Sequence, residues 1–124
     1  MGEERNVHPN ALPNYHTAVI PRSKLEGYAL NPAHTTGQHK ARLFKSMLGF
    51  EKADWEQLAT RILDELPYQE AVRSREDKWG KYYLVSLPIV GLNGNTALVI
   101  TVWVVKTGTD YPSFVTPREI REAG

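Results

Sequence analysis

The sequence contains no cysteine among its 124 residues, which excludes a disulfide framework and any metal site built on thiolates. Long apolar runs are missing too, since no stretch approaches the roughly 18 apolar residues of a membrane-spanning helix. The N-terminus also lacks the apolar segment of a secretion signal. We therefore expect a cytoplasmic protein with no membrane partner.

A strong charge of either sign is absent, because 15 Lys and Arg against 14 Asp and Glu give a formal net charge of +1. The overall electric field is then weak, and a nucleic-acid partner would have to be held by a local cluster of basic side chains. Hydrophobic residues at 41% and charged residues at 23% are typical of a globular protein. The length suits one hydrophobic core, so we expect a single domain.

Several short catalytic signatures are also missing. The chain has no phosphate-binding glycine loop, no dinucleotide fingerprint, no G-x-S-x-G and no H-E-x-x-H. Three of the four histidines, His8, His16 and His34, lie in expected loops at spacings that match no metal site. We expect neither a metal nor a cofactor, with metal binding as the less favoured alternative.

The pattern of apolar residues changes its period along the chain. Apolar residues at helical spacing predict a helix from about Gly37 to Leu48 and a second one that begins at Asp54 and ends at Pro67. From there on, alternating segments rich in Val, Ile, Tyr and Thr predict strands at 68–75, 81–89 and 96–106, with a further extended piece at 113–116.

These elements predict an α+β fold, in which N-terminal helices pack on one face of a three- to four-stranded antiparallel meander. The other face of the sheet is expected to be partly open, although the central strand is apolar on both sides, as in a strand covered twice. We expect a flexible arm at 1–11, one domain at 12–118 and a short tail at 119–124.

The first predicted helix carries basic residues in its first turn. On a helical wheel Lys40 falls near the middle of the apolar face, between Leu43 and Phe44. Lys40 could lie at the rim with its ammonium in water, or it could enter a cleft and hold an anion such as phosphate. His39 is a candidate general acid or base, or an ordinary surface residue, and Arg42 adds a second cation.

The predicted strands supply further candidates. Thr101 is a hydroxyl in an apolar strand and needs a hydrogen-bond partner if buried, and Trp103 is either core or a platform for a base. Arg73 and Tyr83 add a donor and an aromatic ring near the open face. Metal-free RNA cleavage suits this inventory, because the 2′-hydroxyl is an internal nucleophile and the protein needs only proton transfer and cations.

The segments "LPNYHTAVIPRSKLEGYALNP", "GQHKARLFKSMLGF", "VITVWVV" and "SFVTP" together resemble a bacterial family catalogued as domain of unknown function 6883. Members of that family occur as small stand-alone proteins and at the C-terminal ends of phage-head-like and polymorphic-toxin polypeptides. The resemblance covers residues 12 to 117. The order of helices and strands is also similar to the barnase, EndoU and colicin-type group of metal-independent ribonucleases.

Carried over by position, the resemblance implies site residues at His39, Lys40, Thr101, Trp103 and Thr116. The family pattern continues after the threonine with "TAYP"-like sequence, whereas Thr116 is followed here by "PREIREAG". The leading hypothesis is a toxin-like ribonuclease that acts on RNA and is covered by a cognate antitoxin or immunity protein. His39, Lys40, Thr101 and Thr116 would be catalytic, and Arg42, Arg73, Tyr83 and Trp103 would bind substrate. The alternatives are a non-catalytic protein-binding module and an RNA-binding module that use the same groove.

Overall fold

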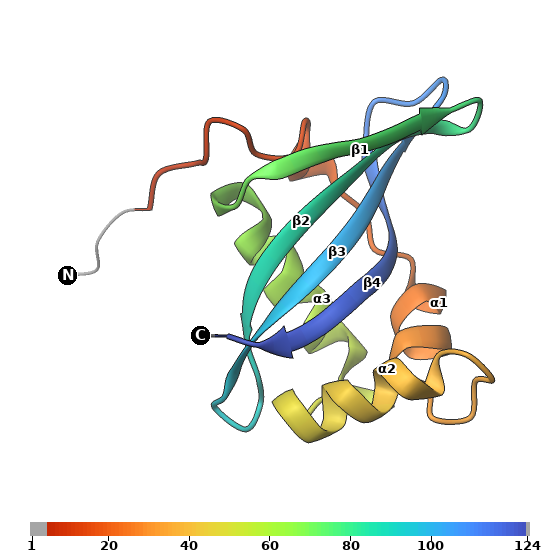
Figure 1. The fold of residues 1–124 in the computed structure, drawn as a ribbon, viewed down its shortest axis with the longest axis vertical. Helices are drawn as coiled ribbons and strands as arrows, with labels where there is room; N and C mark the ends of the chain where they lie inside the picture. Colours follow the sequence, from red (N-terminus) through yellow and green to blue (C-terminus); the bar gives the residue numbers. More distant parts are fainter. Residues whose placement is uncertain (1–4, 124) are drawn as a thin grey trace.

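The computed structural model describes residues 5–123 and shows helices followed by a four-stranded sheet, which confirms the predicted α+β fold (Figure 1). Short helical turns connect the main elements. In chain order the structure contains η1 (Tyr15–Thr17), α1 (Arg22–Lys24), η2 (Leu25–Ala29), α2 (Gln38–Leu43), η3 (Phe44–Leu48), η4 (Lys52–Asp54), α3 (Trp55–Glu65), η5 (Leu66–Tyr68), β1 (Ala71–Asp77), β2 (Gly80–Val90), β3 (Thr96–Lys106) and β4 (Pro112–Glu122).

The sheet is an antiparallel meander in the order β1-β2-β3-β4, as predicted. Helices α1, α2 and α3 lie on one side of it (Figure 1). The core forms between the helices and the inner sheet face because both present large apolar side chains there. It includes Leu25, Phe44, Leu58, Ile62, Val85, Leu87, Val99, Trp103 and Phe114.

No helix of residues 5–123 covers the outer face of the sheet (Figure 1). Several of its apolar residues on the inner strands, Leu84, Leu98, Ile100 and Val102, are only half-buried, whereas Val104 is buried. The two-sided apolar pattern of β3 therefore reflects burial by helices on one side, with neighbouring strands and their side chains giving partial cover on the other.

The second predicted helix starts slightly earlier than its sequence signal. Glu51 and Asp54 form a capping box, in which the Asp54 carboxylate accepts a hydrogen bond from the Glu51 N–H at 2.8 Å. A 3-10 turn, η4, then leads into α3, whose apolar stripe buries Leu58 and Ile62. Glu51 is thus the N-cap of the helical segment that includes η4, and Asp54 is its third residue.

The first predicted helix continues as a π-helix. The α-helical part, α2, passes directly into η3, and Gly49 ends the segment with a positive φ of 76°. The buried residues Ala41, Phe44 and Leu48 follow one another at steps of three and four, so they share one face of the helix, and Leu43 lies well away from that face. Leu43, predicted for the apolar face, is 41% exposed, whereas Phe44 and Leu48 are fully buried.

The outer strands differ from their sequence signals: β1 begins and ends later than the predicted 68–75, and β4 is longer than the predicted 113–116. The β1–β2 turn consists only of Lys78 and Trp79, because Asp77 pairs with Gly80. Strand β4 continues through Glu122, and Ile120 packs into the core. Residues 119–122, expected in the tail, therefore pair with β3.

The N-terminal segment runs beside the end of α3 and the start of β1. The Arg5 guanidinium donates two hydrogen bonds to the Glu65 carboxylate, at 3.0 and 2.6 Å, and lies 4.0 Å from the centre of the Tyr68 ring. The His8 N–H donates to the Pro67 carbonyl, and the Ala71 N–H donates to the Asn10 carbonyl. The predicted arm at 1–11 thus has ordered contacts from Arg5 onward, and its first four residues lie outside the described part of the chain.

Candidate functional site

Two predicted site residues lie in the core instead of a groove. Thr101 and Trp103 are fully buried. The Thr101 hydroxyl donates to the Val85 carbonyl at 2.8 Å and accepts from the Trp103 indole N–H at 2.8 Å. The indole also makes an edge contact with the Phe114 ring at 5.3 Å. Thr101 and Trp103, predicted as site residues, are therefore core residues in the structure. The Thr101 hydroxyl satisfies the buried indole N–H of Trp103.

The three basic residues of α2 face different surroundings. His39 is exposed, and Lys40 is half-buried at the margin of the helix, where α2 packs beside η2 and β4. The rim position expected as one alternative for Lys40 agrees with this partial burial. Arg42 is exposed and lines a separate hollow with Lys45 and Lys52.

The remaining predicted site residues, Arg73, Tyr83 and Thr116, do not form one site. Arg73 is exposed and its guanidinium pairs with the Glu76 carboxylate. Tyr83 is half-buried and packs against the core. Thr116 lines a pocket together with Lys24, Tyr28 and His34 from other elements.

This pocket, called here the His34 pocket, has a volume of about 390 Å³ and lies between α1, η2, the turn before α2 and the edge strand β4. Residues from distant parts of the chain meet there. Its wall consists of Ser23, Lys24, Gly27, Tyr28, His34, Val115 and Thr116.

A bulge in β4 shapes one wall of the His34 pocket. Phe114 pairs with Trp103 and Thr116 pairs with Val102, so Val115 is an extra residue in the ladder. A bulge of this kind bends an edge strand and redirects its side chains. Both Val115 and Thr116 consequently line the pocket, while Phe114 remains in the core.

A close backbone approach positions the opposite wall. A Cβ placed on Gly37 would lie 2.2 Å from the Tyr28 carbonyl oxygen, so only glycine allows the turn before α2 to pack on η2. The ring of Tyr28 in turn meets the ring of His34 edge-on, with 4.8 Å between their centres. Gly37 therefore brings His34 and Tyr28 together.

Hydrogen bonds determine which nitrogen of His34 carries hydrogen. Its Nδ1 accepts from the Gly37 N–H at 2.9 Å and from the Thr36 N–H at 3.1 Å. Backbone N–H groups can only donate, so Nδ1 has no hydrogen and Nε2 carries it in the neutral ring. His34 caps the turn with one nitrogen and has an N–H donor on the other.

The wall of the His34 pocket is rich in donors and contains no carboxylate. Lys24 contributes an ammonium, His34 an N–H donor, and Ser23, Tyr28 and Thr116 hydroxyls. An anion with several acceptor oxygens, such as a phosphate, matches this chemistry. Among residues 5–123, no three His, Asp or Glu side chains are grouped so as to hold a metal ion.

A larger hollow of about 590 Å³ lies on the outer face of the sheet, between Leu84, Ile100 and Arg118. Two carboxylates, Glu70 and Glu119, line it as well. These negative charges make it a less suitable place for a phosphate group.

Sequence reasoning missed Lys24, Tyr28 and His34 because each lies in a segment without a strong secondary-structure pattern. His34 was assigned to a loop without a role. The spacing of His34 and Gly37 could have indicated this wall. A histidine three residues before the first turn of a helix can accept a hydrogen bond from the backbone N–H there and so cap the helix start.

The fold and the pocket define an α+β domain with helices on one face of an open meander and a donor-lined pocket beside its edge strand. The model of the family described as "Domain of unknown function (DUF6883)" matches residues 11–118, and the chain belongs to this family. No curated protein and no solved structure matches the chain. Within the described residues, no helix combines the length and apolar character needed to cross a membrane.

Proposed function

We propose that this domain is a toxin-like, metal-independent endoribonuclease whose site is the His34 pocket. The observation that carries the proposal is the composition of the pocket wall: one ammonium, one histidine N–H and three hydroxyls, with no carboxylate. Such a wall complements the charge that develops on phosphate oxygens during RNA cleavage. The resemblance of the sequence to toxin-borne domains supports the same assignment.

The reaction needs few protein groups. The 2′-oxygen forms a bond to the adjacent phosphorus, the bond from phosphorus to the 5′-oxygen breaks, and the products are a 2′,3′-cyclic phosphate and a 5′-hydroxyl. The Lys24 ammonium stabilises the added negative charge and gives a proton to the departing 5′-oxygen. Thr116 and Ser23 supply hydroxyl donors to the phosphate oxygens.

His34 has a restricted role in this mechanism. Its Nδ1 is occupied by two backbone donors, so the ring donates a hydrogen bond from Nε2 and does not accept the 2′-hydroxyl proton. That proton passes to solvent. We therefore expect the cleavage rate to rise through the neutral pH range without the bell-shaped maximum of a histidine acid–base pair.

The decisive experiment measures cleavage of single-stranded RNA in EDTA by the wild type and by His34→Asn. Asparagine keeps a side-chain oxygen that can cap the Thr36 and Gly37 N–H groups, but it cannot reproduce the Nε2–H donor. We expect the variant to fold and its rate constant to fall about 10²- to 10³-fold, as for loss of one oxyanion donor. His39→Asn is the matched control, and its rate should equal that of the wild type.

Wild-type cleavage that His39→Asn abolishes and His34→Asn preserves would move the site to α2. An absence of cleavage by the wild type, with RNA binding retained, would favour the RNA-binding alternative. As a toxin the protein would have a cognate antitoxin that covers the pocket, and overexpression of the wild type should arrest growth more strongly than overexpression of His34→Asn.

A further inference from the structure

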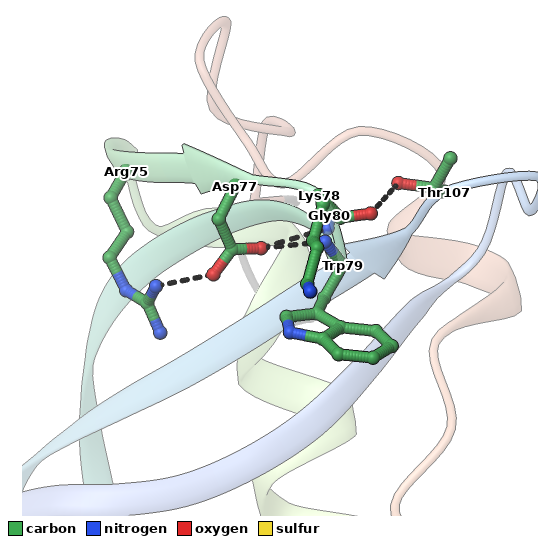
Figure 2. A network of polar contacts seen from close by, with 6 residues as sticks. All are labelled: Arg75, Asp77, Lys78, Trp79, Gly80 and Thr107. Atoms are coloured by element: carbon green, nitrogen blue, oxygen red, sulfur yellow. Dashed lines mark hydrogen bonds and ion pairs between the residues drawn. The ribbon is translucent and has the colours of Figure 1, made fainter.

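The turn between β1 and β2 presents an exposed indole. Trp79 is 66% exposed, the largest exposed fraction among the large hydrophobic residues of the described chain. Figure 2 shows its ring beside the side chain of Lys78, whose ammonium lies 5.0 Å from the ring centre. An exposed indole on a turn offers an open aromatic face on which a planar partner can stack.

The backbone of this turn is held from two sides. The Asp77 carboxylate accepts from the N–H groups of Trp79 and Gly80, at 2.8 and 3.2 Å (Figure 2). On the other side, the Thr107 hydroxyl donates to the Lys78 carbonyl at 3.0 Å, and the Thr107 N–H donates to the Trp79 carbonyl at 2.9 Å. The turn is thus pre-organised, which lowers the entropy cost of binding.

The electrostatics of Asp77 agree with this geometry. Desolvation alone would raise the pKa of its carboxyl, but the Trp79 N–H, the Arg75 guanidinium and the Gly80 N–H together hold that pKa below its ordinary value. The ionised carboxylate therefore keeps its hydrogen bonds at neutral pH. Gly80 is also required, because a Cβ there would lie 2.3 Å from the Val105 carbonyl oxygen.

Three exposed lysines lie in or next to the turn in the sheet register, with Lys81 and Lys106 on opposite faces of the sheet. Lys78 is in the turn, Lys81 follows it in β2, and Lys106 pairs with Gly80 across the ladder. Within residues 5–123 none of these three ammonium groups has a carboxylate within salt-bridge distance, whereas the Arg75 guanidinium pairs with Asp77 at 2.6 Å. Arg75 also stacks on the Tyr82 ring, with 3.9 Å between its guanidinium carbon and the ring centre.

We propose that the β1–β2 turn is a binding site for single-stranded RNA, in which the Trp79 indole stacks on an unpaired base and Lys78 and Lys106 contact the flanking phosphates. The substrate class rests on the proposed ribonuclease function. Lysines are depleted at the centres of protein–protein interfaces, so an indole beside Lys78, with the unpaired Lys106 next to the turn in the ladder, favours a polyanion over a protein partner. Stacking needs an open base face, which a single strand offers and a duplex does not.

The turn and the His34 pocket flank the same strand, β3, through its two neighbours β2 and β4. Gly80 is opposite Lys106, and Thr116 is opposite Val102, four residues further along β3. At about 3.3 Å per residue this separation along the strand is about 13 Å. A strand of a few nucleotides could contact both, while a dinucleotide bound in the pocket would not reach the turn.

The test measures the affinity of a short, unstructured oligoribonucleotide by fluorescence anisotropy, using its non-cleavable 2′-deoxy form at several salt concentrations. Trp79→Ala should bind about 5- to 150-fold more weakly, as expected for loss of one base stack, and Trp79→Phe should recover most of the loss. The double variant Lys78→Gln/Lys106→Gln should reduce the slope of log K against log salt by about 1.4. The matched control Lys45→Gln/Lys52→Gln changes two exposed lysines away from the turn and should leave the slope unchanged.

Cleavage assays separate this proposal from the proposed function. Trp79→Ala should raise the KM for long RNA and leave cleavage of a dinucleotide unchanged, whereas His34→Asn should slow both. If the wild type cleaves nothing, the ribonuclease proposal fails, but the binding assay still tests the turn. Wild-type affinity and salt slope in the Trp79 and lysine variants, with thermal melts showing that they are folded, would overturn the RNA site.

Discussion

At the scale of single residues, the same residue type has opposite roles at two positions of the sheet. Thr101 is fully buried and its hydroxyl serves both the Val85 carbonyl and the Trp103 indole N–H. Thr116 is half-buried at a bulge of the edge strand and lines the His34 pocket. The sequence shows two threonines in apolar strands, and only the ladder register and the bulge distinguish them.

Substituting valine at each position should therefore separate stability from activity. Thr101→Val leaves the buried indole N–H unpaired and should lower the free energy of unfolding by about 1–3 kcal/mol. Thr116→Val should change it by less than about 0.5 kcal/mol but should reduce RNA cleavage. Urea denaturation and cleavage rates per folded molecule measure the two effects. A normal cleavage rate in Thr116→Val would remove this hydroxyl from the proposed site.

At the scale of elements, the first helix shows that the predicted apolar face was too wide. The buried face is formed by Ala41, Phe44 and Leu48, and Leu43, beside that face in the prediction, is 41% exposed. Leu43→Ala should change stability by less than about 0.5 kcal/mol, whereas Leu48→Ala should cost about 2–5 kcal/mol. Urea denaturation of both variants provides the measurement. Equal losses would show that the helix buries both leucines, as the sequence pattern predicted.

The accuracy of the sequence predictions also follows from the physics of each element. The helix around Leu58 and the strand around Val99 were predicted because their apolar periods are strong and set by one continuous core. The wall containing Lys24 and His34 was not predicted, because it depends on a glycine contact and a bulge that bring short, irregular segments together. Neither feature produces a periodic pattern in the sequence.

At the scale of the whole molecule, the sequence predicted that helices pack on one face of the sheet. It did not predict the contact between the N-terminal segment and α3. Helices on one sheet face follow from the order of the periodic segments. The contact between Arg5 and Glu65 joins residues 60 positions apart and leaves no local signal. Similarly, residues 119–122 continue β4 because they pair with β3, although their own composition is polar.

The tie between Arg5 and Glu65 should make stability depend on pH in a specific way. Hydrogen bonds from Arg5 lower the pKa of Glu65 from its usual value near 4.5, against an opposing effect of desolvation and with further help from Gln69. Because the folded-state pKa is depressed, the contribution is fully present above about pH 4.5 and is lost as the pH falls through the lower folded value. Arg5→Ala should therefore have a lower Tm than the wild type at pH 7, and the gap should close on acidification.

Thermal unfolding of both proteins from neutral to acidic pH measures this gap, and the other carboxylates cancel because they titrate in both proteins. Arg121→Ala is the control, since its contact with Glu119 is longer, at 3.7 Å, and more exposed, so solvent weakens the pair. The control should show a small gap at every pH. A gap for Arg5→Ala that stays constant on acidification would show that Arg5 stabilises the fold through its packing on the Tyr68 ring instead of through the Glu65 charge.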